Sequence, residues 1–79
     1  MIRQQDPAQL MHELVQTQAQ AASPVLTAEE QEQFTRIIVK LYVAKLKTAV
    51  VGGAQIRRAL PLMGATREFT EQIAQALWH

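Results

Sequence analysis

The chain has 79 residues, with eight Lys or Arg against seven Asp or Glu, and it has no cysteine. This length leaves room for one hydrophobic core, so we predict a single domain over residues 1–79. The net charge of +1 excludes a strong overall attraction to nucleic acid or anionic lipid, and the missing cysteines exclude disulfides and cysteine-ligated zinc.

A core of this size is expected to be only marginally stable in an isolated chain, because the sequence offers neither a disulfide nor a cysteine-ligated metal to support it. Burying more apolar surface against a second chain would therefore help it. The first ten residues, MIRQQDPAQL, lack the apolar segment of a secretory signal. The most apolar stretch, residues 37–51, is too short and contains too many lysines to cross a membrane. We expect a cytoplasmic protein that does not enter the membrane.

The first predicted helix covers about residues 7–22. Asp6 can cap it, and Pro7 suits the first helical turn because its missing N–H would have no partner there. At 100° per residue the apolar side chains gather on one half of the helix, which is the pattern of a conventional amphipathic helix. That half contains Ala8, Leu10, Met11, Leu14, Val15, Ala21 and Ala22.

A second, longer helix is predicted over about residues 28–50. Thr27 and Glu30 have the spacing of a capping box, in which each side chain accepts the backbone N–H of the other residue. The glycines at 52 and 53 are expected to end the helix, because glycine readily adopts the left-handed conformation that follows many helices.

This second helix carries apolar residues over more than half of its circumference. The first apolar arc contains Phe34, Ile37, Ile38, Leu41 and Ala44. The second apolar arc contains Val39, Tyr42, Val43, Leu46, Ala49 and Val50. One arc would be enough to face a small core. Either other helices of the same chain cover both arcs, or one arc binds a second copy or another protein.

We predict that the second arc is the one that binds a partner. The predicted partner-binding residues are Val39, Tyr42, Val43, Leu46, Val50 and Trp78. Trp78 is included because tryptophan concentrates binding energy at interfaces and because it lies off the apolar side of the last helix. The alternative is that Trp78 folds back over the end of the core.

After the two glycines the sequence predicts a short helix over about residues 54–60 and a last helix over about 67–78. Pro61 discourages the short helix from continuing, and Gly64 followed by Thr66 reads as a stop and a new cap. The predicted core side of the last helix contains Phe69, Ile73, Ala76 and Leu77.

Residues 56–77 also resemble, in outline, a helix-turn-helix, a motif that places its second helix in the major groove of DNA. The candidate nucleic-acid or anion contacts are Arg57, Arg58 and Arg67. Two features argue against DNA binding. Pro61 interrupts the first helix, and the outward side of the second carries Glu68 and Glu71, which phosphates would repel. A solvated surface is the simpler interpretation.

The sequence offers little for catalysis or metal binding. His12 and His79 lack neighbouring ligands at metal-binding spacing, and the three glutamates between 29 and 32 fit the acidic first turn of a helix. We predict no enzyme activity, no cofactor and no metal.

We therefore predict an all-α bundle of three main helices and one short helix that associates through its central helix. Its predicted function is that of a small non-catalytic protein-protein interaction module and homodimer, such as an adaptor, a chaperone partner or an inhibitor of a regulator. The alternative is a small DNA-binding regulator that uses residues 56–77.

Overall fold

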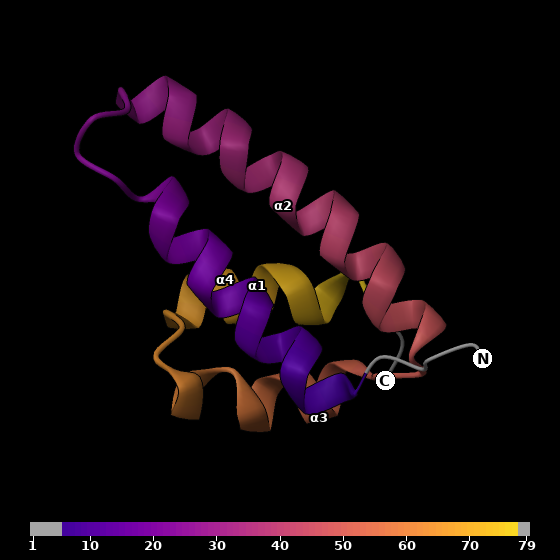
Figure 1. Ribbon diagram of the computed structural model, residues 1–79. Helices are drawn as coiled ribbons and strands as arrows, with labels where there is room; N and C mark the ends of the chain where they lie inside the picture. The colour runs from indigo at the N-terminus through magenta and orange to yellow at the C-terminus, as the bar shows by residue number, and fades with distance from the viewer. Residues whose placement is uncertain (1–5, 78–79) are drawn as a thin grey trace.

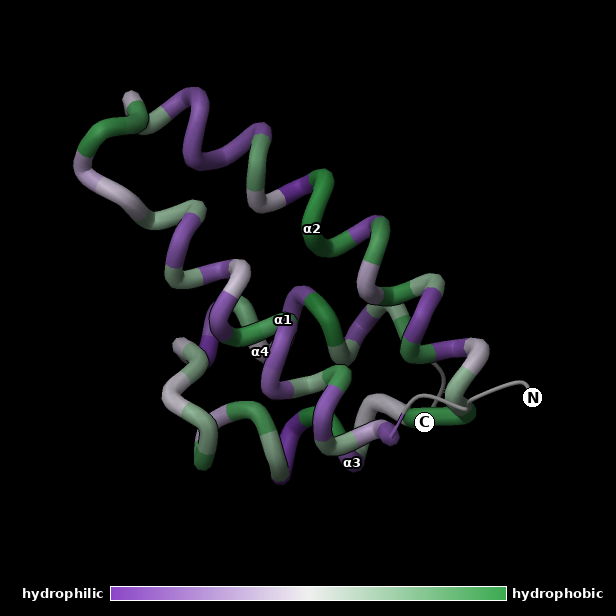
Figure 2. The backbone as a smooth tube through the Cα atoms, in the orientation of Figure 1, coloured by the Kyte–Doolittle hydropathy of each residue, from purple (hydrophilic) through white to green (hydrophobic). Residues whose placement is uncertain are grey.

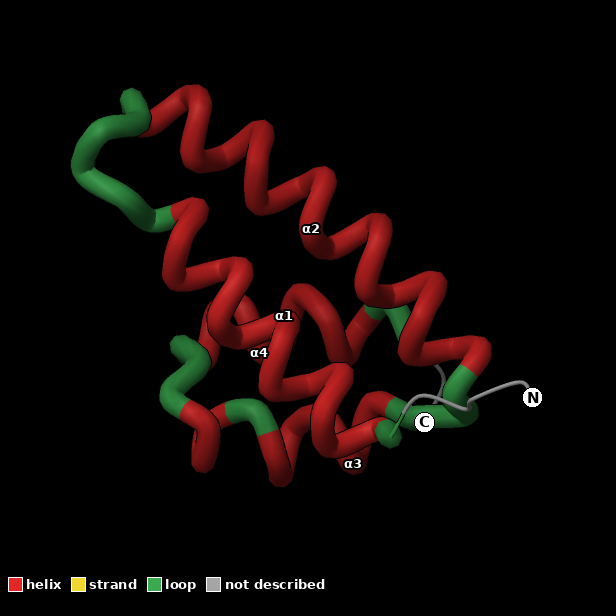
Figure 3. Tube along the Cα trace, viewed as in Figure 1, coloured by secondary structure: helices red, strands yellow, loops and turns green. Residues whose placement is uncertain are grey.

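The computed structural model describes residues 6–77, and these residues form helices joined by turns (Figures 1 and 3). Four α-helices and one short 3-10 helix are present in this part of the chain, and it contains no strand. Their bounds are α1 Pro7–Ala21, α2 Ala28–Thr48, α3 Gly53–Ala59, η1 Pro61–Met63 and α4 Arg67–Gln75. The prediction of an all-α fold with three main helices and one short helix is confirmed.

The starts of the three main helices follow from local side-chain chemistry. The Asp6 carboxylate accepts the backbone N–H two residues later at 3.0 Å. Thr27 and Glu30 form the predicted capping box: the Thr27 hydroxyl accepts the Glu30 N–H at 3.1 Å, and the Glu30 carboxylate accepts the Thr27 N–H at 2.9 Å. The Thr66 hydroxyl accepts the Phe69 N–H at 3.2 Å. Each cap satisfies a backbone donor that the first helical turn leaves unpaired.

The end of α2 differs from the prediction. The left-handed residue is Val50, with φ 60°, and not one of the two glycines that follow. The N–H groups of Val50 and Val51 bond back to the carbonyls of Lys47 and Leu46 at 3.0 and 2.9 Å. This is a Schellman motif, which requires a left-handed residue at this position. Gly52 instead has φ −96° and caps α3.

The helices form two pairs. α1 and α2 make an antiparallel hairpin joined by residues 22–27, and α3 packs mainly on α4 (Figure 1). α4 also contacts α2, which closes the core between the two pairs. The N-terminal part of α2 and the end of α1 extend together beyond α3 and α4 (Figure 1). Within the described residues no helix is long and apolar enough to span a bilayer.

The core draws on all four α-helices. Its buried apolar residues are Leu10, Met11, Leu14, Ala21, Ile38, Tyr42, Val43, Leu46, Val51, Ile56, Leu60, Phe69, Ile73, Ala74 and Leu77. The predicted core side of the first helix is right for its large residues, whereas Ala8 and Ala22 are exposed. For the last helix the prediction included Ala76, which is exposed, and it missed Thr70 and Ala74, which are buried. The Thr70 hydroxyl donates to the Thr66 carbonyl at 2.8 Å, so this polar group is satisfied.

Candidate interaction surface on α2

One side of α2 is built into the core of its own chain. Tyr42, Val43 and Leu46 retain 7%, 9% and 0% of their accessible surface, and Ile38 is buried with them. The Tyr42 hydroxyl lies 3.4 Å from the hydroxyl of Thr17 on α1, which gives the ring a polar partner across the hairpin. We call these four residues of α2 the buried side.

This arrangement places most of the predicted partner-binding residues in or against the core of the chain. Tyr42, Val43 and Leu46 are core residues, and Val39 is partly buried against the same core. Val50 is exposed, but it stands alone just beyond the end of α2. Trp78 lies outside the described residues. The predicted set therefore does not form one accessible surface.

The accessible apolar residues of α2 come instead from the first arc. Phe34, Ile37 and Leu41 keep 46%, 65% and 51% of their surface exposed. Ala44 and Thr48 are exposed on the same line of the helix. We call these five residues the exposed stripe. Figure 2 shows that apolar residues recur along α2 from its middle to its C-terminal end, after a hydrophilic first part.

The exposed stripe has the spacing of a coiled-coil seam. Its members are separated by three, four, three and four residues, which is the a and d pattern of a heptad repeat. By the helical period, the stripe and the buried side lie roughly 150° apart around α2. A strict a and d stripe is narrower than the apolar side of a helix that packs into a globular core. This heptad spacing was the signal in the sequence that could have identified the stripe.

Charge is distributed unevenly along α2. Glu29, Glu30 and Glu32 are exposed in its first part, where carboxylates interact favourably with the helix dipole. Lys45 and Lys47 lie in its last turn, where cations do the same, and Lys40 precedes them. The helix therefore has an acidic end and a basic end beside the exposed stripe.

Two of these charged groups have defined contacts. The pKa of the Glu30 carboxyl is lowered from its ordinary value of 4.5, first because the Thr27 backbone N–H binds the carboxylate and then because the Thr27 side chain does. The Lys45 ammonium lies over the Tyr42 ring, 5.1 Å from its centre. This is within the range of a cation-π contact. It gives the Lys45 charge a favourable contact on the apolar part of α2.

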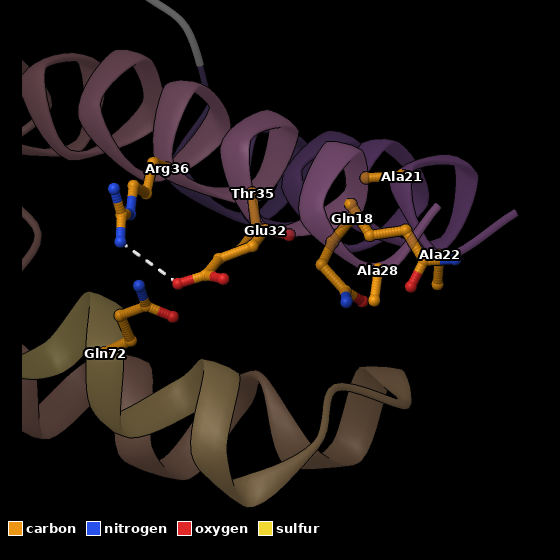
Figure 4. Close-up of a pocket in the computed structure, with 9 residues that line it drawn as sticks. Gln18, Ala21, Ala22, Ala28, Glu32, Thr35, Arg36 and Gln72 are labelled. Carbon is orange, nitrogen blue, oxygen red and sulfur yellow. Dashed lines mark hydrogen bonds and ion pairs between the residues drawn. The ribbon is translucent and has the colours of Figure 1, made fainter. Parts of the chain in front are cut away.

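A polar cleft lies between α4 and the hairpin of α1 and α2 (Figure 4). Arg36 donates to Glu32 at 3.0 Å along its wall, and Gln72 of α4 points toward this ion pair (Figure 4). Gln18, Gln31 and Thr35 complete the polar lining. The Arg36 and Glu32 side chains are 72% and 66% exposed. An ion pair in such free contact with water does not form the enclosed acid-base pair of a catalytic site.

Two of the three candidate nucleic-acid contacts, Arg57 and Arg67, line one pocket together with Glu71. Arg57 of α3 donates to Glu71 of α4 at 2.8 Å, so its charge is matched within the chain. Arg58 and Arg67 are exposed. Glu68 is also exposed in the first turn of α4, where it would meet the phosphates of a bound duplex. DNA binding by residues 56–77 remains a sequence prediction that no second observation supports.

The described residues contain no group of three or more His, Asp or Glu side chains placed to hold a metal ion. His12 lies on the exposed side of α1, and its Nε2 atom is 3.3 Å from the side-chain amide of Gln16. This contact links two neighbours on one helix surface and creates no enclosed site.

No protein-family model, no curated protein and no solved structure matches this chain.

Proposed function

We propose that the protein is a small non-catalytic protein-protein interaction module that self-associates through the exposed stripe of α2. One observation carries this proposal: three large apolar side chains, Phe34, Ile37 and Leu41, are about half exposed in a single line on a helix whose other side fills the core. Contiguous exposed apolar residues of this kind mark interaction sites, whereas single ones need no explanation. An aromatic residue at one end of the line supplies a large anchor.

The dimensions of the stripe predict weak association. From Phe34 to Thr48 it is about 21 Å long at 1.5 Å per residue. One helix surface of this length is smaller than the ~800 Å² per partner of a standard interface. We therefore expect a reversible dimer whose dissociation constant is in the range of about 10 μM to 1 mM. A surface that exchanges partners this easily suits an adaptor, a chaperone partner or an inhibitor of a regulator.

Sedimentation equilibrium over a wide range of protein concentration tests the proposal. Leu41→Glu places a charge in the middle of the stripe, and each dimer would have to bury two such charges. Leu62→Glu is the matched control, because Leu62 of η1 is 89% exposed and distant in sequence from the stripe. Circular dichroism shows whether both variants keep the wild-type helical content.

We expect the wild-type protein and Leu62→Glu to shift from monomer to dimer as concentration rises. Leu41→Glu should remain monomeric, with at least about a tenfold loss of affinity. A wild-type protein that is monomeric up to millimolar concentration would contradict the proposal. Equal disruption by the two substitutions would contradict the assignment of the stripe.

A further inference from the structure

We infer that the occupant of the exposed stripe is α2 of a second copy, running antiparallel and related by a two-fold axis that passes near residue 39. This inference rests on the proposed function and specifies its geometry. Three properties of α2 point to it: the sizes of the stripe residues, the order of charges along the helix, and the position of one lysine.

The sizes of the stripe residues favour the antiparallel arrangement. With the two-fold axis near residue 39, two residues face each other when their numbers add up to 78. Phe34 then faces Ala44 of the other copy, and Ile37 faces Leu41. These layers combine a large residue with a small one, or two of intermediate size, which fills the middle of the interface evenly, and Thr48 at its end faces Glu30. A parallel pair would put Phe34 on Phe34 and Ala44 on Ala44, so it would be crowded at one end and loose at the other.

The charges along α2 favour the same arrangement. Glu29 and Lys47 are both exposed, one at the acidic end of α2 and the other at its basic end. They are 18 residues apart, about 27 Å along the helix, so they cannot meet within one copy. In the antiparallel pair the acidic end of each α2, which carries Glu29, lies alongside the basic end of the other, which carries Lys47, and symmetry makes this pairing of opposite charges twice.

The parallel arrangement would bring like charges together. In a parallel pair, residues at the two edges of the seam meet with an offset of five residues along the chain. Lys40 would then face Lys45 of the other copy, on both sides of the dimer. The acidic ends of α2 would also lie together, and so would the basic ends. An antiparallel pair instead aligns the helix dipoles in opposite directions.

Lys40 identifies the centre of the proposed interface. In the antiparallel pair the Lys40 side chains of the two copies lie close together, offset by about 3 Å along the helix axis. Their long stems can lie along the stripe while the ammonium groups turn to solvent, but the two charges still repel. We therefore expect Lys40→Gln to strengthen the dimer by about threefold at low salt, and expect this gain to shrink as salt is added.

Because the chain has no cysteine, single cysteine substitutions report directly on the geometry. Lys40→Cys places a thiol close to the proposed two-fold axis, where it meets its own counterpart. Thr48→Cys places a thiol about 27 Å from its counterpart in the antiparallel pair, but next to it in a parallel pair. Gln55→Cys, on the exposed part of α3, measures disulfides formed by random collision.

Under mild oxidation we expect Lys40→Cys to form a disulfide-linked dimer at least ten times faster than Gln55→Cys, and Thr48→Cys to match Gln55→Cys. Fast crosslinking of Thr48→Cys would overturn the antiparallel geometry while leaving self-association intact. If neither variant exceeds Gln55→Cys, and sedimentation also finds only monomer, the proposed function itself fails.

A charge exchange provides an independent test. Glu29→Lys alone and Lys47→Glu alone each convert two attractive contacts per dimer into repulsive ones, so each should weaken dimerisation by about three- to tenfold. The double variant restores both contacts with reversed charges and should return to within about twofold of wild type. Additive weakening in the double variant would contradict the contact, because the two residues are too far apart to interact in one copy.

Discussion

The two apolar sides of α2 have similar residues, but one side is buried and the other is exposed. Leu46 on the buried side and Leu41 in the exposed stripe are five residues apart, yet they are 0% and 51% exposed. The buried side spans a wide arc that contacts α1 and α4, whereas the stripe is one residue wide and follows a heptad spacing. The comparison shows that hydrophobicity alone does not decide which apolar side of a helix is buried, because α1 and α4 pack against one side of α2 only.

Alanine substitutions of Leu46 and Leu41 should show the largest difference between the buried side and the exposed stripe. Leu46→Ala should lower the free energy of unfolding by about 2 to 5 kcal/mol, because it removes buried contacts and leaves a cavity. Leu41→Ala should lower it by less than about 1 kcal/mol, because half of the side chain is already in water. Urea unfolding at low micromolar concentration, where association is negligible, measures both. Equal losses would contradict the assignment of the two sides.

The two ends of α2 also differ. Its N-terminus has a complete capping box, whereas Val50, just beyond its C-terminus, is a β-branched residue in a left-handed conformation. Val50→Gly should raise the free energy of unfolding by about 1 kcal/mol, because glycine adopts φ 60° without the steric cost that Val50 bears. Val50 is 75% exposed, so little packing is lost.

Val25 is the control for this substitution, because it is also exposed and does not have a positive φ. Val25→Gly should give no gain in thermal or urea unfolding, and a modest loss is expected from the added freedom of the unfolded chain. A gain of the same size in both variants would show that the effect does not come from the conformation of Val50.

The polar contact across the hairpin contributes less. Tyr42→Phe should lower the free energy of unfolding by about 0.5 kcal/mol, because the 3.4 Å contact with the Thr17 hydroxyl is long and weak. A double-mutant cycle with Thr17→Val isolates the interaction between the two hydroxyl groups. A coupling free energy of zero would mean that the two groups do not interact.

The smallest expected effect is the acid response of the capping box. Because the folded state lowers the pKa of Glu30 below its ordinary value of 4.5, the ionised carboxylate stabilises the fold above that pH. This contribution should disappear as the pH falls from about 4.5 through the lower folded-state pKa. Glu30→Gln should therefore reduce the acid dependence of unfolding.

Glu29 lies next to Glu30 in the first turn of α2 and makes no capping contact, so Glu29→Gln is the matched control for this measurement. Urea unfolding between pH 3 and pH 6 compares the two variants with wild type. If Glu29→Gln reduces the acid dependence as much as Glu30→Gln does, the capping box is not its source.

Helix boundaries could be predicted wherever the chemistry is local. The caps at Asp6, Thr27 and Thr66 involve residues within three positions of each other, so the sequence alone identifies them. The end of α2 was the exception. Two glycines suggested a left-handed residue at 52 or 53, but the last turn closes earlier and Val50 takes that conformation.

The presence of two apolar arcs on α2 could also be read from the helical period, and surplus apolar surface on this helix was correctly expected. Their roles could not be assigned in this way, because the arc predicted to bind a partner contains Tyr42, Val43 and Leu46, which are buried. A helical wheel records angles around one axis and contains nothing about where α1 and α4 lie. That choice depends on the turn at residues 22–27 and on contacts between residues far apart in sequence, such as Thr17 with Tyr42.

Local hydrogen bonds and periodicity were thus enough to determine the fold class, the helix starts and the amphipathic character of each helix, because these depend on neighbours along the chain. Packing between helices was needed to decide which apolar residues are buried and which remain exposed. Burial is a competition between whole surfaces for a limited interior, and in this chain Tyr42, Val43 and Leu46 occupy it while Phe34, Ile37 and Leu41 are left in contact with water.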